Sequence, residues 1–144
     1  MKITIHTDGG SRGNPGPAAL GYVIEIPDTE KIAEGEYLGE TTNNVAEYTA
    51  ILRSLQRVVQ ILGESEAKKA QIKLYLDSEL AQRQLTGVYK VKNAGLKPIA
   101  QQIWNIEKKF DTIEYNHVKR ALNKEADAQV NIALDNYLHD TKTT

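Results

Sequence analysis

The chain has 144 residues and no cysteine, so it has the length of one ordinary domain and excludes a disulfide framework or a thiolate zinc site. No stretch approaches the roughly 20 apolar residues of a membrane span, and the residues after Met1 lack the apolar run of a signal peptide. The formal net charge of −1 shows no basic excess that would by itself indicate a nucleic-acid partner. We therefore expect a single cytoplasmic domain over residues 1–144, without membrane contact.

The first part of the chain predicts three strands. Apolar and polar residues alternate from Lys2 to Asp8, as a strand requires. Turn-forming residues follow at 9–17, and residues 18–26 and 31–38 are typical of two further strands around a turn. This succession indicates an antiparallel meander.

Helices and strands alternate in the rest of the chain. Residues 41–44 supply N-cap candidates for a long helix, which Gly63 ends. The later elements are a strand at 72–77, short helices at 78–85 and around 99–106, a strand at 112–118 and a helix capped by Asn123. The order βββαβααβα predicts an α/β fold with a mixed five-stranded sheet, antiparallel in its first three strands and flanked by helices. Residues 139–144 are expected to form a frayed tail.

Four acidic residues lie where solvation and capping do not explain them. Asp8 and Asp77 each end a predicted strand, at the sheet edge where open α/β folds bind ligands. Glu47 and Asp127 share the inward flank of their helices with apolar residues, and neither has an obvious inward cation nearby in sequence. Either distant Lys or Arg residues pair with these carboxylates, or the four groups bind divalent cations such as Mg²⁺. Two ions held in this way would suit phosphoryl transfer.

Four segments carry a resemblance to a known family. They run from Thr7 to Pro17, from Thr41 to Glu47, from Tyr75 to Ser78 and from Asn123 to Asp127. In this order and on these elements they resemble the type 1 ribonuclease H family, and the likeness covers essentially the whole chain. The resemblance implies the ribonuclease H-like fold and an endonuclease that hydrolyses the RNA strand of an RNA–DNA hybrid. It also implies a two-metal-ion mechanism that leaves 5′-phosphate and 3′-hydroxyl ends.

The same resemblance assigns roles to individual residues. The metal-binding quartet would be Asp8, Glu47, Asp77 and Asp127, holding two Mg²⁺ ions that Mn²⁺ can replace, with Asp8 bridging both. Asn14, Asn43 and Asn44 match positions that contact the minor groove, where the 2′-hydroxyl distinguishes RNA from DNA. Thr42 matches a position that holds a phosphate of the DNA strand, and Ser78 falls among the substrate-binding positions.

The chain departs from the best-studied bacterial pattern in two places. Glu79 stands where Gln is common after the Asp-Ser pair, so a substrate contact there is not implied. Residues 87–93 lead directly into the next helix, without room for the basic protrusion of some members, as in the shorter form of archaea and some bacteria.

Residues 81–124 are rich in basic residues, with nine Lys or Arg and three Asp or Glu. Lys90, Lys92 and Lys97 could supply salt-sensitive contacts with the substrate. The same run also fits a solvated face.

The residue that assists proton transfer or product release is left open between two candidates. Counting back from Asn123 without a gap selects His117, whereas a shortened loop selects Arg120. We prefer Arg120, because His117 belongs to a predicted strand and equally fits a packed structural histidine. A guanidinium would bind phosphate but could not act as a general base near neutral pH.

Two alternatives to a hybrid-specific nuclease follow from the same residues. One is a broader ribonuclease that also cleaves double-stranded RNA, as some short archaeal relatives do. The other is a catalytically silent hybrid-binding module, although such a module has no evident reason to face four carboxylates toward phosphates. Because Met1 stands directly before the first strand, we expect a free-standing protein rather than a domain of a reverse transcriptase. We also expect it to be a monomer.

Overall fold

The computed structural model describes residues 1–143, with side chains described for residues 1–138. Its five strands are β1 (Lys2–Ser11), β2 (Gly16–Glu25), β3 (Ile32–Thr41), β4 (Gln71–Leu76) and β5 (Thr112–His117). Its helices are α1 (Asn43–Leu62), α2 (Glu64–Ala67), α3 (Glu79–Leu85), α4 (Lys97–Glu107) and α5 (Lys124–Thr143), with a 3₁₀ turn at Arg120–Leu122. Within these residues no helix is long and apolar enough to cross a membrane.

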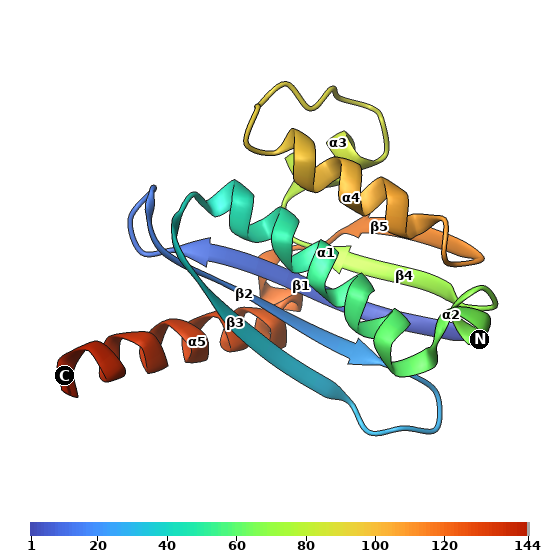
Figure 1. Ribbon diagram of the computed structural model, residues 1–144, viewed down its shortest axis with the longest axis horizontal. Coiled ribbons are helices and arrows are strands. Elements are labelled where there is room, and N and C mark those ends of the chain that lie inside the picture. The colour runs from blue at the N-terminus through green and yellow to red at the C-terminus, as the bar shows by residue number, and fades with distance from the viewer. Residues whose placement is uncertain (144) are drawn as a thin grey trace.

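The strands form one mixed sheet in the order β3-β2-β1-β4-β5 (Figure 1). Strand β2 is antiparallel to both β1 and β3, whereas β4 is parallel to both β1 and β5. The predicted mixed sheet is therefore confirmed. Because β1, β4 and β5 run in one direction, their carboxyl ends meet at one edge of the sheet, where ligands bind in folds of this kind.

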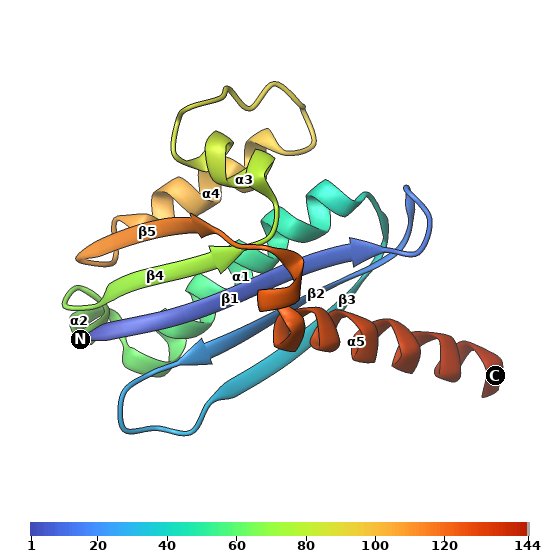
Figure 2. The same cartoon turned by 180° about the vertical axis from the view of Figure 1, so that it is seen from behind.

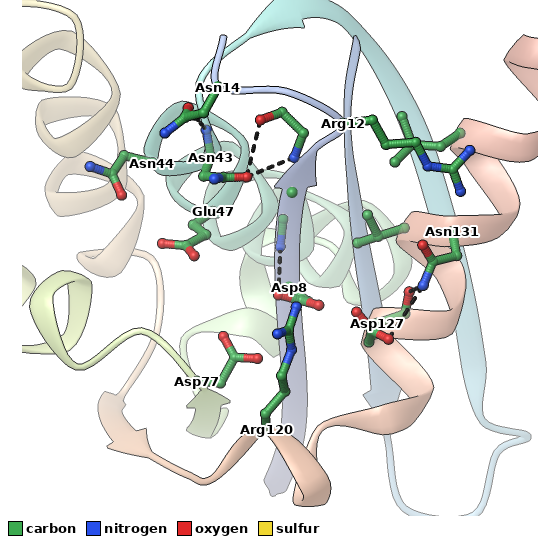
Figure 3. Close-up of a pocket in the computed structure, with 15 residues that line it drawn as sticks. Asp8, Arg12, Asn14, Asn43, Asn44, Glu47, Asp77, Arg120, Asp127 and Asn131 are labelled. Carbon is green, nitrogen blue, oxygen red and sulfur yellow. Dashed lines mark hydrogen bonds between the residues drawn. The ribbon is translucent and has the colours of Figure 1, made fainter. Parts of the chain in front are cut away.

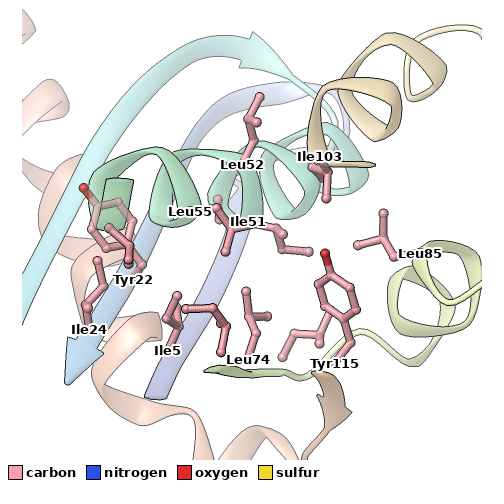
Figure 4. Packing of buried hydrophobic residues seen from close by; sticks show 14 of the residues in the cluster. Ile5, Tyr22, Ile24, Ile51, Leu52, Leu55, Leu74, Leu85, Ile103 and Tyr115 are labelled. Atoms are coloured by element: carbon pink, nitrogen blue, oxygen red, sulfur yellow. The ribbon is translucent and has the colours of Figure 1, made fainter. Parts of the chain in front are cut away.

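Helices cover the two faces of the sheet unequally. Helix α1 lies across one face, and α5 lies on the other over β1, β2 and β3 (Figures 1 and 2). The main core fills the α1 side with fully buried residues such as Ile5, Ile51, Leu55 and Leu74 (Figure 4). The α5 side has a smaller core of Ala19, Val130 and Leu134. Each helix is thus held by an apolar stripe facing the sheet.

Two glycines beside Asp8 let both covering helices approach the sheet closely. A Cβ on Gly9 would lie 2.3 Å from the carbonyl carbon of Ala46, the residue before Glu47. Gly21 pairs with Asp8 across the β1–β2 ladder, and a Cβ there would lie 2.4 Å from the carbonyl oxygen of Ala126, the residue before Asp127. Only glycine fits at such an approach of two backbones. The two glycines therefore bring the helical carboxylates next to Asp8.

The predicted elements are all present, with differences at their ends. Strand β1 continues to Ser11, because its pairing extends to Ser11 opposite Ala18 and includes residues expected in the turn. Helix α2 and the 3₁₀ turn at Arg120–Leu122 were not predicted, since elements of three or four residues show no apolar periodicity. The tail expected at 139–144 lies outside the residues whose side chains are described, and the backbone of α5 continues to Thr143.

Asn123 stands at the start of α5 as predicted, but its side-chain NH₂ bonds to β1. The main-chain oxygen of Asn123 accepts from the amide of Asp127 at 3.1 Å, as at a helix start. Its side-chain NH₂, however, donates to the main-chain oxygen of Thr7 at 2.8 Å, and its buried Oδ1 has no hydrogen-bond partner among the described residues. Asn123 therefore ties α5 to β1 instead of capping α5 with its side chain.

Candidate functional site

The four predicted carboxylates line a single pocket at the carboxyl-terminal edge of β1 and β4 (Figure 3). Asp8 comes from β1 and Asp77 directly follows β4, while Glu47 is the fifth residue of α1 and Asp127 lies in the first turn of α5. The remaining lining residues are Gly9, Gly10, Ser11, Arg12, Asn14, Asn43, Asn44, Arg120, Val130, Asn131 and Leu134. The pocket thus gathers residues from widely separated parts of the chain.

Asp8 is the most buried of the four carboxylates, with 7% of the residue exposed. Its Oδ1 accepts from the amide of Gly9 at 2.9 Å, and its carboxyl is within hydrogen-bond reach of Asp127. Burial raises the pKa of Asp8 to about 8, and the charges of Asp77 and Asp127 act in the same direction. Ionised Asp8 is therefore unfavourable unless a cation joins it.

Glu47 has a related environment but a different hydrogen-bond partner. Burial raises its pKa to about 7, the Ser78 hydroxyl opposes this rise by hydrogen bonding, and the charge of Asp77 adds to it. The Ser78 hydroxyl also accepts from the amide of Ala81 at 3.1 Å and so caps α3. Ser78 does not line the pocket, and it acts on the site through Glu47 and α3.

The donor set suits divalent cations with oxygen ligands. Among the described side chains, no Lys, Arg or His nitrogen lies within 4.0 Å of any of the four carboxylates, so the alternative of protein ion pairs is not realised. Across the same residues no three acidic or histidine side chains already converge as the ligands of one closed metal site would. The carboxylates fit an open site instead, in which Mg²⁺ keeps water and substrate phosphate among its ligands.

Amide side chains form a second wall of the pocket. The Oδ1 of Asn43 accepts from the amide of Ser11 at 2.7 Å and from its hydroxyl at 3.1 Å. The Oδ1 of Asn14 accepts from the amide of Asn43 at 3.1 Å, and Thr42 caps α1 by accepting from the amide of Val45 at 3.3 Å. These bonds fix the β1–β2 turn against the start of α1. Asn14, Asn43 and Asn44 all line the pocket, whereas Thr42 does not.

Comparison with known proteins gives one consistent family. A family model described as reverse transcriptase-like matches residues 6–133. The solved structure of RNase H1 from the halophilic archaeon Halobacterium salinarum is 36% identical, covers 94% of this chain and 99% of that one, and has a TM-score of 0.84. The structure of LC11-RNase H1 in complex with an RNA/DNA hybrid is 40% identical, with coverages of 94% and 99% and a TM-score of 0.87. The chain belongs to the type 1 ribonuclease H family.

A longer relative shows that such a domain also occurs within larger proteins. The bifunctional protein Rv2228c of Mycobacterium tuberculosis is 40% identical over 137 residues, which is 94% of this chain. The chain spans 36% of the length of that relative. The similarity therefore concerns the ribonuclease H domain alone.

The two candidates for the fifth residue of this ribonuclease H site are placed differently. Arg120 lies in the 3₁₀ turn before α5 and lines the pocket (Figure 3). His117 ends β5 opposite Leu76 and does not line the pocket. Its side chain is exposed, so the interpretation of a packed structural histidine is wrong. The geometry favours the preferred candidate, Arg120.

The three lysines proposed to contact the substrate, Lys90, Lys92 and Lys97, do not line the carboxylate pocket. Lys90 and Lys97 line a second hollow beside Tyr89 and Trp104, over the loop between α3 and α4. The guanidinium of Arg83 lies 5.6 Å from the ring centroid of Tyr89, a cation–π distance. Lys92 is exposed in the same loop. The hollow of Lys90 and Lys97 shares no lining residue with the carboxylate pocket.

The polar pocket residues Ser11, Arg12 and Asn131 were not predicted from the sequence. The side-chain NH₂ of Asn131 donates to the main-chain oxygen of Asp127 at 3.2 Å and to its Oδ2 at 3.3 Å, and so orients that carboxylate. The spacing of four residues on a helix was a usable signal for this pair. Arg12 also lines the pocket, but its partner Asp135 is distant in sequence and no local pattern indicates it.

Proposed function

We propose that this protein is a metal-dependent endonuclease that hydrolyses the RNA strand of RNA–DNA hybrids. The observation that carries the proposal is a single pocket in which four carboxylates, none of them ion-paired with a described Lys, Arg or His, lie beside three asparagines. Carboxylates hold the ions that phosphodiester hydrolysis needs, and amides can hydrogen-bond the 2′-hydroxyls that mark an RNA strand. The hybrid bound to LC11-RNase H1 supports the same substrate.

Asp8, Glu47, Asp77 and Asp127 would hold two Mg²⁺ ions, for which Mn²⁺ could substitute. When bound, these ions would activate the attacking water and stabilise the leaving oxygen, giving 5′-phosphate and 3′-hydroxyl ends. The protein residues keep the carboxylates in place: Asn131 orients Asp127, and Ser78 hydrogen-bonds Glu47. The raised pKa values of Asp8 and Glu47 support the proposal, because a bound cation removes the cost of ionising them.

Arg120 is proposed to bind phosphate at the reacting centre. It lines the pocket, is not engaged in any ion pair of the described residues, and stays charged at all relevant pH values. A guanidinium offers paired donors to two phosphate oxygens. It would orient the phosphate or help the product depart, and it would not transfer a proton.

The test is cleavage of an end-labelled RNA strand annealed to DNA, with duplex RNA, single-stranded RNA and duplex DNA as parallel substrates. With Mg²⁺ we expect RNA cleavage in the hybrid, abolished by a chelator, and a loss of roughly 10³-fold in Asp8→Asn. Asp28→Asn is the matched control, because Asp28 is an exposed turn residue outside the pocket. Full activity of Asp8→Asn would contradict the proposal, and cleavage of duplex RNA would establish the broader ribonuclease.

A further inference from the structure

A second arginine lies at the end of the pocket remote from Arg120. Arg12 follows Ser11 at the end of β1, and its side chain extends toward α5 rather than toward the carboxylates (Figure 3). Its Nη2 lies 2.7 Å from Oδ1 of Asp135 on α5. Among the described lining residues Arg12 and Arg120 carry the positive charges, so they bracket the four carboxylates.

The contact with Asp135 determines where along α5 the Arg12 guanidinium lies. Asp127, Asn131 and Asp135 follow one another at intervals of four residues, so they lie on one face of α5. At about 1.5 Å per residue, Asp135 lies roughly 12 Å along the helix from Asp127. Arg12 in its contact with Asp135 is therefore too far from the carboxylates to bind the reacting phosphate. It is placed for another phosphate of the strand that crosses them.

The main chain around Arg12 is already fixed for such a role. The amide of Arg12 donates to the oxygen of Pro17 at 2.9 Å, and the amide of Ser11 donates to Asn43 at 2.7 Å. Only the side chain has to move for the guanidinium to change partner. Because the backbone is already ordered, phosphate binding would have to order only the side chain.

Breaking the ion pair between Arg12 and Asp135 costs little free energy. The two side chains are 39% and 67% exposed, and ion pairs with such exposure contribute little to stability. An arginine–phosphate contact is charge-assisted and commonly bidentate, so it is stronger than this single contact. A phosphate brought alongside α5 would therefore displace Asp135.

We propose that Arg12 binds a non-scissile phosphate of the RNA strand and that Asp135 competes with this phosphate for the guanidinium. The inference rests on the proposed function and adds a phosphate subsite along α5 to it. Asp135 then weakens substrate binding, although its contact with Arg12 joins the β1–β2 turn to α5. A purely structural ion pair would behave differently, since loss of either partner would have the same small effect on stability and none on binding.

Binding of a fluorescent RNA–DNA hybrid, measured by anisotropy in a chelator at several salt concentrations, separates these cases. Arg12→Ala should weaken binding several-fold and lower the slope of log K against log salt by about one unit. Asp135→Asn should tighten binding, and the double variant should match Arg12→Ala. Arg53→Ala and Glu36→Gln are the matched controls, because that exposed pair lies outside the pocket.

Weaker hybrid binding by Arg12→Ala together with tighter binding by Asp135→Asn would support the inference. Arg12→Lys should retain the slope of log K against log salt but lose part of the affinity for the hybrid. Unchanged affinity in Arg12→Ala, or a change of the same sign in both single variants, would overturn it. Hybrid cleavage by the unmodified protein is assayed alongside. Absence of cleavage with an Arg12-dependent salt slope would contradict only the proposed function, and cleavage without that slope would contradict only the subsite.

Discussion

The side-chain amide of Asn123 donates to the main-chain oxygen of Thr7 at 2.8 Å, across 116 positions of the chain. Thr7 directly precedes Asp8, and Asn123 accepts the first main-chain hydrogen bond of α5 from Asp127. One buried side chain therefore links the two segments that carry neighbouring carboxylates. Only 1% of Asn123 is exposed, so water cannot replace this bond.

Asn123→Asp should destabilise the protein by about 2–4 kcal/mol, because a carboxylate would face the Thr7 oxygen inside the protein without a donor. Urea unfolding monitored by circular dichroism in a chelator measures this change. Asn131→Ala is the control, since Asn131 is exposed and its loss should cost less than about 1 kcal/mol. Equal stabilities of the two variants would show that the link to Thr7 contributes nothing.

Without metal, the free energy of unfolding should fall as pH rises from about 4 to about 8. In the folded protein the pKa of Asp8 is about 8, against a usual value of 3.8, so the folded state holds a proton that the unfolded chain releases. The contribution of Asp8 to the free energy of unfolding is fully present below pH 3.8 and is lost as the pH rises through about 8. Glu47, with a pKa of about 7, acts in the same direction.

Asp8→Asn should accordingly be inactive and yet more stable than the unmodified protein in a chelator at pH 9, by about 1–3 kcal/mol. Melting temperatures measured between pH 4.5 and 9 test this expectation. Mg²⁺ should raise the melting temperature of the unmodified protein most at high pH, since it binds the ionised carboxylates. Parallel pH profiles for the two proteins would refute the assigned environment of Asp8.

Gly21→Ala should lower both stability and activity. The new Cβ would meet the Ala126 oxygen at 2.4 Å, so α5 would have to move away from β2 and take Asp127 with it. We expect a loss of about 1–3 kcal/mol and a lower kcat. Gly95→Ala is the control, because its Cβ would meet only the end of an exposed side chain, at 3.1 Å. Normal kcat in Gly21→Ala would show that the close approach of α5 is dispensable.

Arg120→Ala should reduce cleavage under saturating hybrid by about 10-fold or more, since a charged donor to phosphate is lost. Arg120→Lys should recover part of the rate, because the charge returns without the planar fork. His117→Ala should be within about 2-fold of the unmodified rate, as His117 lies outside the pocket. Single-turnover rates measure all three, and the reverse ranking would select His117 as the assisting residue.

The sequence was most informative where a local pattern decides the structure. The alternation from Lys2 to Asp8 predicted β1, and the N-cap candidates at 41–44 together with Gly63 predicted the two ends of α1. The strand-end and inward-flank positions of the four carboxylates predicted that they would meet. These are properties of a few consecutive residues.

Long-range contacts were not accessible in the same way. The Gly-rich residues after Asp8 look like a turn, and only pairing with β2 shows that they continue the strand. The amide of Asn123 reaches Thr7 instead of capping its own helix, and Arg12 meets Asp135 from the opposite end of the chain. Such partners depend on the completed packing, which no local spacing encodes.

The distribution of the carboxylates along the chain has a consequence during synthesis. A growing polypeptide that has emerged as far as Asn123 contains Asp8, Glu47 and Asp77 but lacks Asp127. It also lacks the apolar residues of α5 that cover the second face of the sheet. A ribosome-bound chain of that length should therefore be unable to cut the hybrids it encounters, and nuclease activity should begin only after α5 has been translated and has docked.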